Sequence, residues 1–302
     1  MKNVRFIYNA TSGETTITAY LDKIIETYQE KGFAIRPHRL TFAGDEQREM
    51  LSEVDGSYHH ILIAGGDGTI NYVVNCMKRR GLDIPVAVLP AGTSNDFAKM
   101  LAVPNDIAKA CRRILAGEIH EVDLGRANDE YFVNVFSCGL FTDVSQKTPT
   151  VLKNNFGKLA YYFGGLGELP NFRKMHISID TDCGNFDGTS LIFFVFNGRT
   201  AGQFRLAYLS EIDDGLLDVL IIKGDNPLET IRTILHFLKR SQKNYPAGIV
   251  HFKCRDLMIR SANDEQTDID GQPGPQFPVH ITCEAGALKV IRPRQESKSK
   301  KG

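Results

Sequence analysis

Short apolar runs alternate with amphipathic stretches through the first 120 residues of the chain. A short apolar run predicts a buried strand, and apolar positions three or four residues apart predict a helix. The predicted strands are Val4–Tyr8, Phe33–Thr41, Ile61–Ala64 and Pro85–Leu89, and the predicted helices are Ile17–Tyr28, Asp45–Val54, Ile70–Arg80 and Ile107–Leu115. This alternation predicts a doubly wound, mostly parallel α/β sheet with helices on both faces.

The pattern changes near Gly117, where short strands with turn signals begin to dominate. The predicted strands are Val122–Arg126, Tyr131–Phe136, Met175–Asp180, Leu191–Asn197, Leu216–Ile222, His251–Ile259, Val279–Cys283 and Leu288–Ile291, with helices at Phe156–Leu166 and Leu228–Leu238 and hairpin turns at Asn128-Asp129 and Asp187-Gly188. We expect an α/β nucleotide-binding domain over residues 1–120 and a C-terminal antiparallel β-sandwich domain over residues 121–292. The last strand could return toward the first domain, and residues 293–302 are expected to form a basic, disordered tail.

Three polar turns follow strands of the predicted parallel sheet: Asn9–Gly13, Gly65–Thr69 and Pro90–Asp96. The carboxyl ends of parallel strands meet at one edge, so the three turns are expected to lie together there. Glycine lets the backbone approach a phosphate, and N–H groups at a helix N-terminus favour an anion. Any one of these turns alone could be an ordinary strand-to-helix connection. Asp67 would repel a phosphate unless a cation lay between them, so the three turns together predict a nucleotide bound with Mg²⁺.

Composition excludes several function classes. The formal net charge is zero, which gives no indication of nucleic-acid binding. No run is long enough to span a bilayer, and the N-terminus reads at once as a strand, so we expect a soluble or peripheral protein without a signal peptide. The cysteines form no CxxC pair, which predicts reduced core thiols in a cytosolic protein; they are Cys76, Cys111, Cys138, Cys183, Cys254 and Cys283. The chain also lacks the P-loop pattern and the protein-kinase motifs.

Acidic residues stand at four predicted turns. Asp67 and Asp96 end two strands of the same sheet, so both carboxylates could face one Mg²⁺–nucleotide. Asp96 could equally be the N-cap of a helix that begins at Phe97. The acidic segments Ile212–Leu216 and Asp264–Gln272 belong to the second domain, and each could be a surface turn or part of a site.

Taken together, the motifs resemble the diacylglycerol kinase catalytic-domain family, whose bacterial lipid kinases are related to sphingosine and ceramide kinases. The resemblance covers nearly the whole chain, and the GGDGT element followed by PxGTxNDFA is specific to the lipid-kinase branch. It runs through Asn9-x-x-Ser12-Gly13, Gly65-Gly66-Asp67-Gly68-Thr69-Ile70-Asn71, Pro90-x-Gly92-Thr93-x-Asn95-Asp96-Phe97-Ala98, Phe132-x-Asn134-x-x-Ser137-x-Gly139, Asp213-Asp214-Gly215-Leu216-Leu217-Asp218-Val219 and Asp270-Gly271.

The resemblance implies the two-domain fold, ATP in the cleft between the domains, and a role for each matching residue. Asp67 and Asp96 would act on the catalytic Mg²⁺, and Asp270 would be the general base on the lipid hydroxyl. A second, structural Mg²⁺ would be held by the Asp214 side chain with the carbonyls of Glu211 and Leu216. The residues implied to contact ATP are Asn9, Ala10, Thr11, Ser12, Gly13, Thr41, Gly65, Gly66, Asp67, Gly68, Thr69, Ile70, Asn71, Tyr72, Gly92, Thr93 and Asn95.

The main departure from the family pattern is Gln272, because the family's base turn is typically Asp-Gly-Glu. Gln272 would slow the reaction or shift the substrate, and Asp268 could compensate. The expected function is transfer of the γ-phosphate of ATP to a lipid hydroxyl, either diacylglycerol to give phosphatidic acid or a related lipid, and the sequence does not distinguish these acceptors. The alternatives are a NAD kinase-like small-molecule kinase and a catalytically impaired regulator that binds nucleotide or lipid.

A lipid kinase needs a face for the membrane. Val151–Phe172 interleaves aromatic residues with lysines, which suits a membrane surface or, equally, a helix in the core of the β domain. We expect a cytoplasmic protein, peripheral at the inner membrane face, with a lipid substrate as its partner. An exposed edge strand could also pair two copies into a homodimer.

Overall fold

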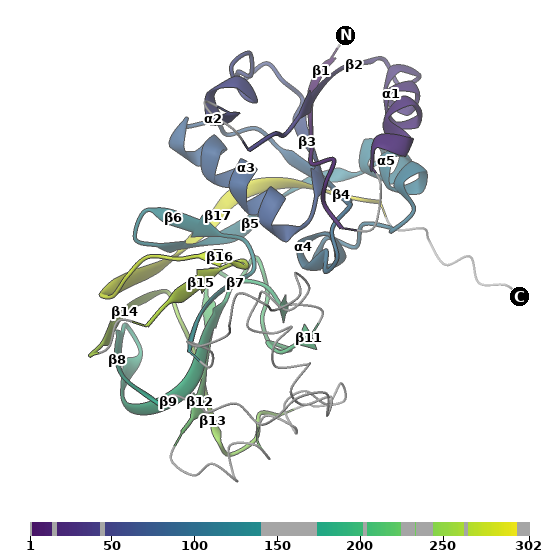
Figure 1. Ribbon diagram of the computed structural model, residues 1–302. Helices are drawn as coiled ribbons and strands as arrows, with labels where there is room; N and C mark the ends of the chain where they lie inside the picture. Colours follow the sequence, from purple (N-terminus) through teal and green to yellow (C-terminus); the bar gives the residue numbers. More distant parts are fainter. Residues whose placement is uncertain are drawn as a thin grey trace, which may run out of the picture. The chain divides into compact units, whose positions relative to one another are not determined.

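The chain forms two compact units in the computed structural model, which describes residues 2–13, 17–42, 46–139, 174–201, 204–224, 233, 244–262 and 265–294 (Figure 1). The first unit comprises Met1–Val122 and Leu288–Gly302, and the second comprises Asp123–Ala287. Strands β5 (Glu118–Ala127) and β17 (Val279–Arg292) run from one unit into the other.

The first unit is a parallel sheet between helices, as predicted. Its elements are β1 (Lys2–Tyr8), the 3-10 helix η1 (Ile17–Tyr20), α1 (Leu21–Gln29), β2 (Phe33–Arg39), α2 (Glu46–Glu49), β3 (His60–Gly65), α3 (Asp67–Arg79), β4 (Val86–Pro90), α4 (Asp96–Met100) and α5 (Ile107–Leu115). Helices α1 and α5 cover one face of the sheet, and α2 and α3 cover the other (Figure 1).

The strand order in the first unit is β17-β4-β3-β1-β2, and every pair is parallel. β17 contributes its last residues, where Val290 lies opposite Val86. The chain goes from β1 outward to β2 and then returns to the other side of β1 as β3. The edge after β1 and β3 is therefore the point where the direction of winding reverses, which is where ligands bind in such sheets.

Helix α2 is shorter than the predicted Asp45–Val54. Arg5 explains where it ends, because its guanidinium takes carbonyls that a longer helix would use. Arg5 Nε donates to Met50 O at 2.7 Å, and Arg5 Nη2 donates to Glu49 O at 3.3 Å. Met50 and Leu51 are still fully buried, as the apolar pattern required.

The second unit is antiparallel, as predicted. Its strands besides β5 and β17 are β6 (Glu130–Phe132), β7 (Val135–Gly139), β8 (Met175–Thr181), β9 (Gly184–Phe196), β10 (Thr200–Ala201), β11 (Phe204–Arg205), β12 (Leu217–Lys223), β13 (Ile249–Cys254), β14 (Asp256–Ser261), β15 (Thr267–Ile269) and β16 (Gln272–Pro273). Alternate residues of β9 enter two different cores, because side chains alternate across a strand. Phe193 and Val195 pack in one core, and Ile192, Phe194 and Phe196 pack in the other.

Two predicted strands are each divided in the structure. The run Tyr131–Phe136 breaks into β6 and β7, because the backbone N–H groups at the break donate to the side chain of Asp270. The run His251–Ile259 breaks into β13 and β14 at Arg255, where the chain changes partners: β13 pairs with β12, and β14 pairs with β8 and β17.

Two further predictions about the strands were wrong. Val279–Cys283 and Leu288–Ile291 form the single strand β17. Asp187-Gly188 is not a turn but lies inside β9, opposite Ser178 and Ile177. The β8–β9 turn comes earlier because Thr181 Oγ1 closes it, accepting from Cys183 N at 3.2 Å and donating to Gly184 O at 2.5 Å. Asn128-Asp129 is a two-residue hairpin turn, as predicted.

Some predictions fall on residues outside the described ranges. These are the helix Phe156–Leu166, the segment Val151–Phe172, the tail after Arg294, and Leu228–Leu238 apart from Thr233. Among the cysteines, Cys183 is exposed in the β8–β9 turn rather than in the core, and the other five are buried. Within the described parts of the chain, no helix has the length and apolar character needed to cross a membrane.

Acid should destabilise the first unit through His60. His60 is fully buried, with Nε2 3.1 Å from the hydroxyl of Tyr28 and Nδ1 2.8 Å from Nδ1 of His59. Burial, and secondarily the charge of His59, lowers the pKa of His60 to about 3. In the unfolded chain, His60 takes up a proton near pH 6.5. The contribution of His60 to the unfolding free energy is therefore fully present above that pH and is lost as the pH falls toward about 3.

We expect this loss to be up to about 1.4 kcal/mol for each pH unit below about 6.5. The free energy of unfolding, measured against urea at several pH values, should fall less steeply in His60→Gln than in the wild type. His176→Gln, which changes an exposed histidine, is the control and should keep the wild-type slope. Equal slopes for all three proteins would show that His60 carries no such linkage.

Candidate active site

The structure brings the three predicted turns of the first unit into contact. Asn9, after β1, donates from Nδ2 to Thr69 Oγ1 at 3.2 Å. Ser12 Oγ accepts from Gly66 N at 3.0 Å. These bonds join the turn after β1 to the turn after β3, at the edge where the winding of the sheet reverses.

The glycines of these turns lie so close that no side chain would fit. A Cβ on Gly92 would lie 2.3 Å from Gly66 Cα, and a Cβ on Gly65 would lie 2.5 Å from Thr69 Cβ. Gly13 has φ +60° and would place a Cβ 2.7 Å from Ala91 O. Glycine is therefore required at these positions for the three turns to pack against one another.

Asp67 joins the second turn to the third. It is the first residue of α3, and its carboxylate accepts from Asp96 N at 3.0 Å and from Phe97 N at 2.9 Å. Asp67 thus caps the N-terminus of α4. The alternative role of Asp96 as N-cap is wrong, because Asn95 holds that position in the left-handed conformation (φ 51°) and Asp96 is the first helical residue.

The remaining predicted nucleotide contacts differ in their surroundings. Asn95 closes its own turn, accepting from Gly92 N at 2.8 Å and donating to Gly92 O at 2.7 Å. Thr41 is exposed after β2, whereas the Ile70 side chain is 1% exposed and belongs to the core. Phe42, a residue that sequence reasoning did not single out, is 53% exposed, and its ring centroid is 5.5 Å from that of Tyr72.

The donor set of this edge fits a magnesium nucleotide. Asp67 is half-buried and Asp96 is 3% exposed, so two carboxylates stand beside the glycine turns. Carboxylate oxygens are the ligands that Mg²⁺ prefers, and the N-terminus of the 13-residue helix α3 favours an anion.

In the second unit, Asp270 occupies a tight hairpin turn between β15 and β16. Asp270 (φ 48°) and Gly271 (φ 87°) both adopt the left-handed conformation that this turn needs. The Asp270 carboxylate accepts from three backbone N–H groups: Oδ2 from Val133 at 2.7 Å, and Oδ1 from Asn134 at 3.0 Å and from Val135 at 2.9 Å. Asp270 therefore holds the turn between β6 and β7.

The other two predicted residues of this hairpin are placed differently from Asp270. Gln272 is exposed and pairs with Ile269. Asp268 accepts from Gly271 N at 2.9 Å, so its carboxylate supports the turn.

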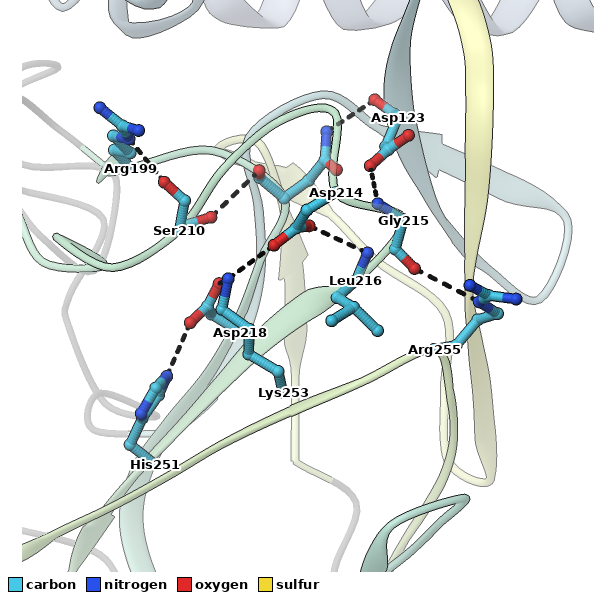
Figure 2. A network of polar contacts seen from close by, with 11 residues as sticks. Asp123, Arg199, Ser210, Asp214, Gly215, Leu216, Asp218, His251, Lys253 and Arg255 are labelled. Atoms are coloured by element: carbon cyan, nitrogen blue, oxygen red, sulfur yellow. Dashed lines mark hydrogen bonds and ion pairs between the residues drawn. The ribbon is translucent and has the colours of Figure 1, made fainter.

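The predicted structural metal site lies before β12, in the turn that contains Asp214 and Gly215 (Figure 2). Lys253 Nζ lies 2.6 Å from Asp214 Oδ2 and 3.6 Å from Asp218 Oδ2. Burial alone would lower the pKa of Lys253, but the hydrogen bond with Asp214 and the charge of Asp218 raise it above its ordinary value. The ammonium group therefore stays charged, and these residues do not fit a divalent cation at Asp214.

Asp123 is a second residue that sequence reasoning missed. It is 2% exposed, and its carboxylate accepts from Gly215 N at 2.7 Å and from Gly286 N at 2.8 Å. Its backbone carbonyl accepts from Asn197 Nδ2 at 2.8 Å. The sequence feature that could have identified Asp123 is its position as an acidic residue between Val122 and Leu124.

Known proteins share both the sequence and the fold of this chain. Residues 3–127 match the family described as diacylglycerol kinase catalytic domain, and residues 134–292 match the YegS C-terminal NAD kinase beta sandwich-like domain. A diacylglycerol kinase of Bacillus subtilis (strain 168) is 31% identical over 299 residues, covering 98% of each chain. A diacylglycerol kinase of Staphylococcus aureus (strain Newman) is 31% identical over 293 residues, covering 97% of this chain and 93% of that protein.

Solved structures from Bacillus anthracis str. Sterne have the same fold. One chain superposes with a TM-score of 0.83 at 24% identity, covering 96% of both chains. A diacylglycerol kinase from the same organism superposes with a TM-score of 0.77 at 22% identity and the same coverage. These structures show the fold alone. The family matches over both halves of the sequence and the relatives at 31% identity establish that this chain belongs to the diacylglycerol kinase catalytic-domain family.

Proposed function

We propose that this chain transfers the γ-phosphate of ATP to the hydroxyl group of a lipid, with diacylglycerol as the favoured acceptor and Mg²⁺ required. The observation that carries the proposal is the contact of three turns at one sheet edge, with Asp67 joining two of them. The names of the relatives support a lipid as acceptor.

The proposal gives the first unit the task of holding the nucleotide. The bare backbone at Gly65, Gly66 and Gly92 would lie against the phosphates, and Asp67 and Asp96 would hold Mg²⁺. A bound Mg²⁺ ion would neutralise part of the negative charge of the phosphates. Because phosphoryl transfer depends chiefly on alignment, the rigid connection of the turns to one another is what these residues contribute.

The proposal gives Asp270 the role of general base on the lipid hydroxyl. Its carboxylate is held in one orientation by the three backbone N–H groups of residues 133–135, which is what a positioned base requires. Gln272, two residues away and exposed, stands where the family typically has a glutamate. Gln272 would therefore tune the rate or the acceptor rather than replace Asp270.

To reach a lipid acceptor, the protein would also have to associate peripherally with a membrane surface. Zero formal net charge makes general attraction to anionic lipid weak, so a local surface would have to provide the contact.

The test is transfer of labelled γ-phosphate to a panel of lipids in mixed micelles with Mg²⁺, with NAD as a separate acceptor. The wild type should phosphorylate a lipid, diacylglycerol foremost, and not NAD. Gln272→Glu should change the rate or the order of preferred lipids while leaving the ATP-induced rise in unfolding temperature unchanged. Labelled NAD without labelled lipid would replace the proposal with a small-molecule kinase. ATP binding with no labelled product from either protein would indicate a nucleotide-binding regulator.

A further inference from the structure

Two carboxylates, Asp214 in the turn before β12 and Asp218 in that strand, lie against basic side chains of the same chain. Asp214 lies in the turn, and Asp218 lies in β12 with a fully buried side chain. Asp218 Oδ1 is 2.6 Å from His251 Nε2. Lys253 lies between the two acidic residues, close to an oxygen of each (Figure 2).

The register of the sheet explains why basic groups gather here. His251 and Lys253 are two residues apart in β13, so their side chains share one face. Arg255 follows directly after the end of this strand. Lys253 is directly opposite Asp218 in the β12–β13 ladder. Opposite charges at such a position attract across the strands.

The turn itself meets a second cation. Arg255 Nε donates to the carbonyl of Gly215 at 3.4 Å, immediately after Asp214. The other oxygen of Asp214 accepts from Leu216 N at 3.1 Å. A divalent cation on Asp214 would have to displace the Lys253 ammonium group or lie beside it, and this repulsion disfavours binding.

We propose that the Lys253 ammonium group takes the place of a divalent cation at Asp214, so that this turn is closed by an internal ion pair and binds no metal. The proposal concerns the β domain alone and does not depend on which lipid is phosphorylated. It requires that the ion pair, and not a bound ion, holds the start of β12 against β13.

Counting bound Mn²⁺ tests the proposal directly. The probe is Mn²⁺ alone, titrated without nucleotide into the full chain and followed by electron paramagnetic resonance of the free ion. The proteins are the wild type, Asp214→Asn, Lys253→Met and the double variant. Lys223→Met is the matched control, because it removes an exposed lysine at the end of the neighbouring strand β12.

We expect the wild type, Asp214→Asn and Lys223→Met to bind the same number of Mn²⁺ ions. Lys253→Met should gain one ion per chain, since it leaves Asp214 and Asp218 without their ammonium partner, and the double variant should lose that ion again. One ion fewer in Asp214→Asn than in the wild type would overturn the proposal. No gain in Lys253→Met would also contradict it, and this comparison holds even if Asp214→Asn fails to fold.

Discussion

Asp67→Asn is expected to lower phosphoryl transfer by roughly 10- to 100-fold, because it alters two functions of one carboxylate. The first is the pair of hydrogen bonds from the backbone of Asp96 and Phe97, which fixes the third turn against the second. The amide of asparagine can accept on its oxygen only, so its NH₂ group would face a backbone N–H. The second is the negative charge, which the proposed Mg²⁺ site requires.

Measuring stability alongside activity separates these two functions. Loss of one acceptor for a partly buried N–H costs about 1–3 kcal/mol of unfolding free energy. If the folded variant binds ATP without Mg²⁺ as the wild type does but no longer responds to Mg²⁺, charge is the dominant contribution. Asp83→Asn, which changes an exposed aspartate of the same unit paired with Lys289, is the control. If Asp67→Asn transferred phosphate at a rate within a few-fold of the wild-type rate, Asp67 would not be a ligand of the proposed metal site.

The edge that carries the three turns could be predicted because its signals are local and its placement follows from topology. Strand β3 is buried along its whole length, and its apolar run is visible in the sequence. The glycines of the following turn are equally visible. Once the strands alternate with helices, the carboxyl ends of β1, β3 and β4 must meet at one edge. The contacts of Ser12 with Gly66 and of Asp67 with Phe97 are the result.

The second unit was less predictable because its organising contacts join distant residues. Asp270 and Val133 are 137 residues apart, and the hydrogen bond between them divides a continuous apolar run into β6 and β7. Nothing near Val133 in the sequence indicates that break. The same holds for Lys253: its distance from Asp214 depends on the pairing of β12 with β13, which no local pattern encodes.

The shortening of α2 has a similar cause. The apolar spacing correctly predicted that Met50 and Leu51 would be buried. It could not show that Arg5, in a strand 45 residues earlier, would take the Met50 carbonyl. Periodicity thus predicts which side chains enter the core better than it predicts where a helix ends.

Asp270→Asn is expected to lower lipid phosphorylation by roughly 100- to 10,000-fold, the usual contribution of a general base. The substitution also disturbs the fold, because three N–H groups from residues 133–135 converge on this carboxylate and the asparagine nitrogen cannot accept any of them. Asparagine tolerates the left-handed backbone at this position (φ 48°), so the turn itself should persist.

The matched control for Asp270→Asn is Asp268→Asn in the same hairpin. Asp268 also accepts a backbone N–H, from Gly271, so we assign its carboxylate to support of the turn and not, as the sequence suggested, to compensation for Gln272. Asp270→Asn should lose about 1–3 kcal/mol of unfolding free energy for a partly buried N–H that is left unpaired. Asp268→Asn should lose less, because the Gly271 N–H is exposed to water. Activity should be measured at a temperature where both are folded and both show the ATP-induced rise in unfolding temperature. Under those conditions only Asp270→Asn should lose transfer. If the two variants lost activity equally, and only in proportion to their unfolded fraction, Asp270 would be a structural residue that holds β6 to β7, and the base would have to be sought elsewhere.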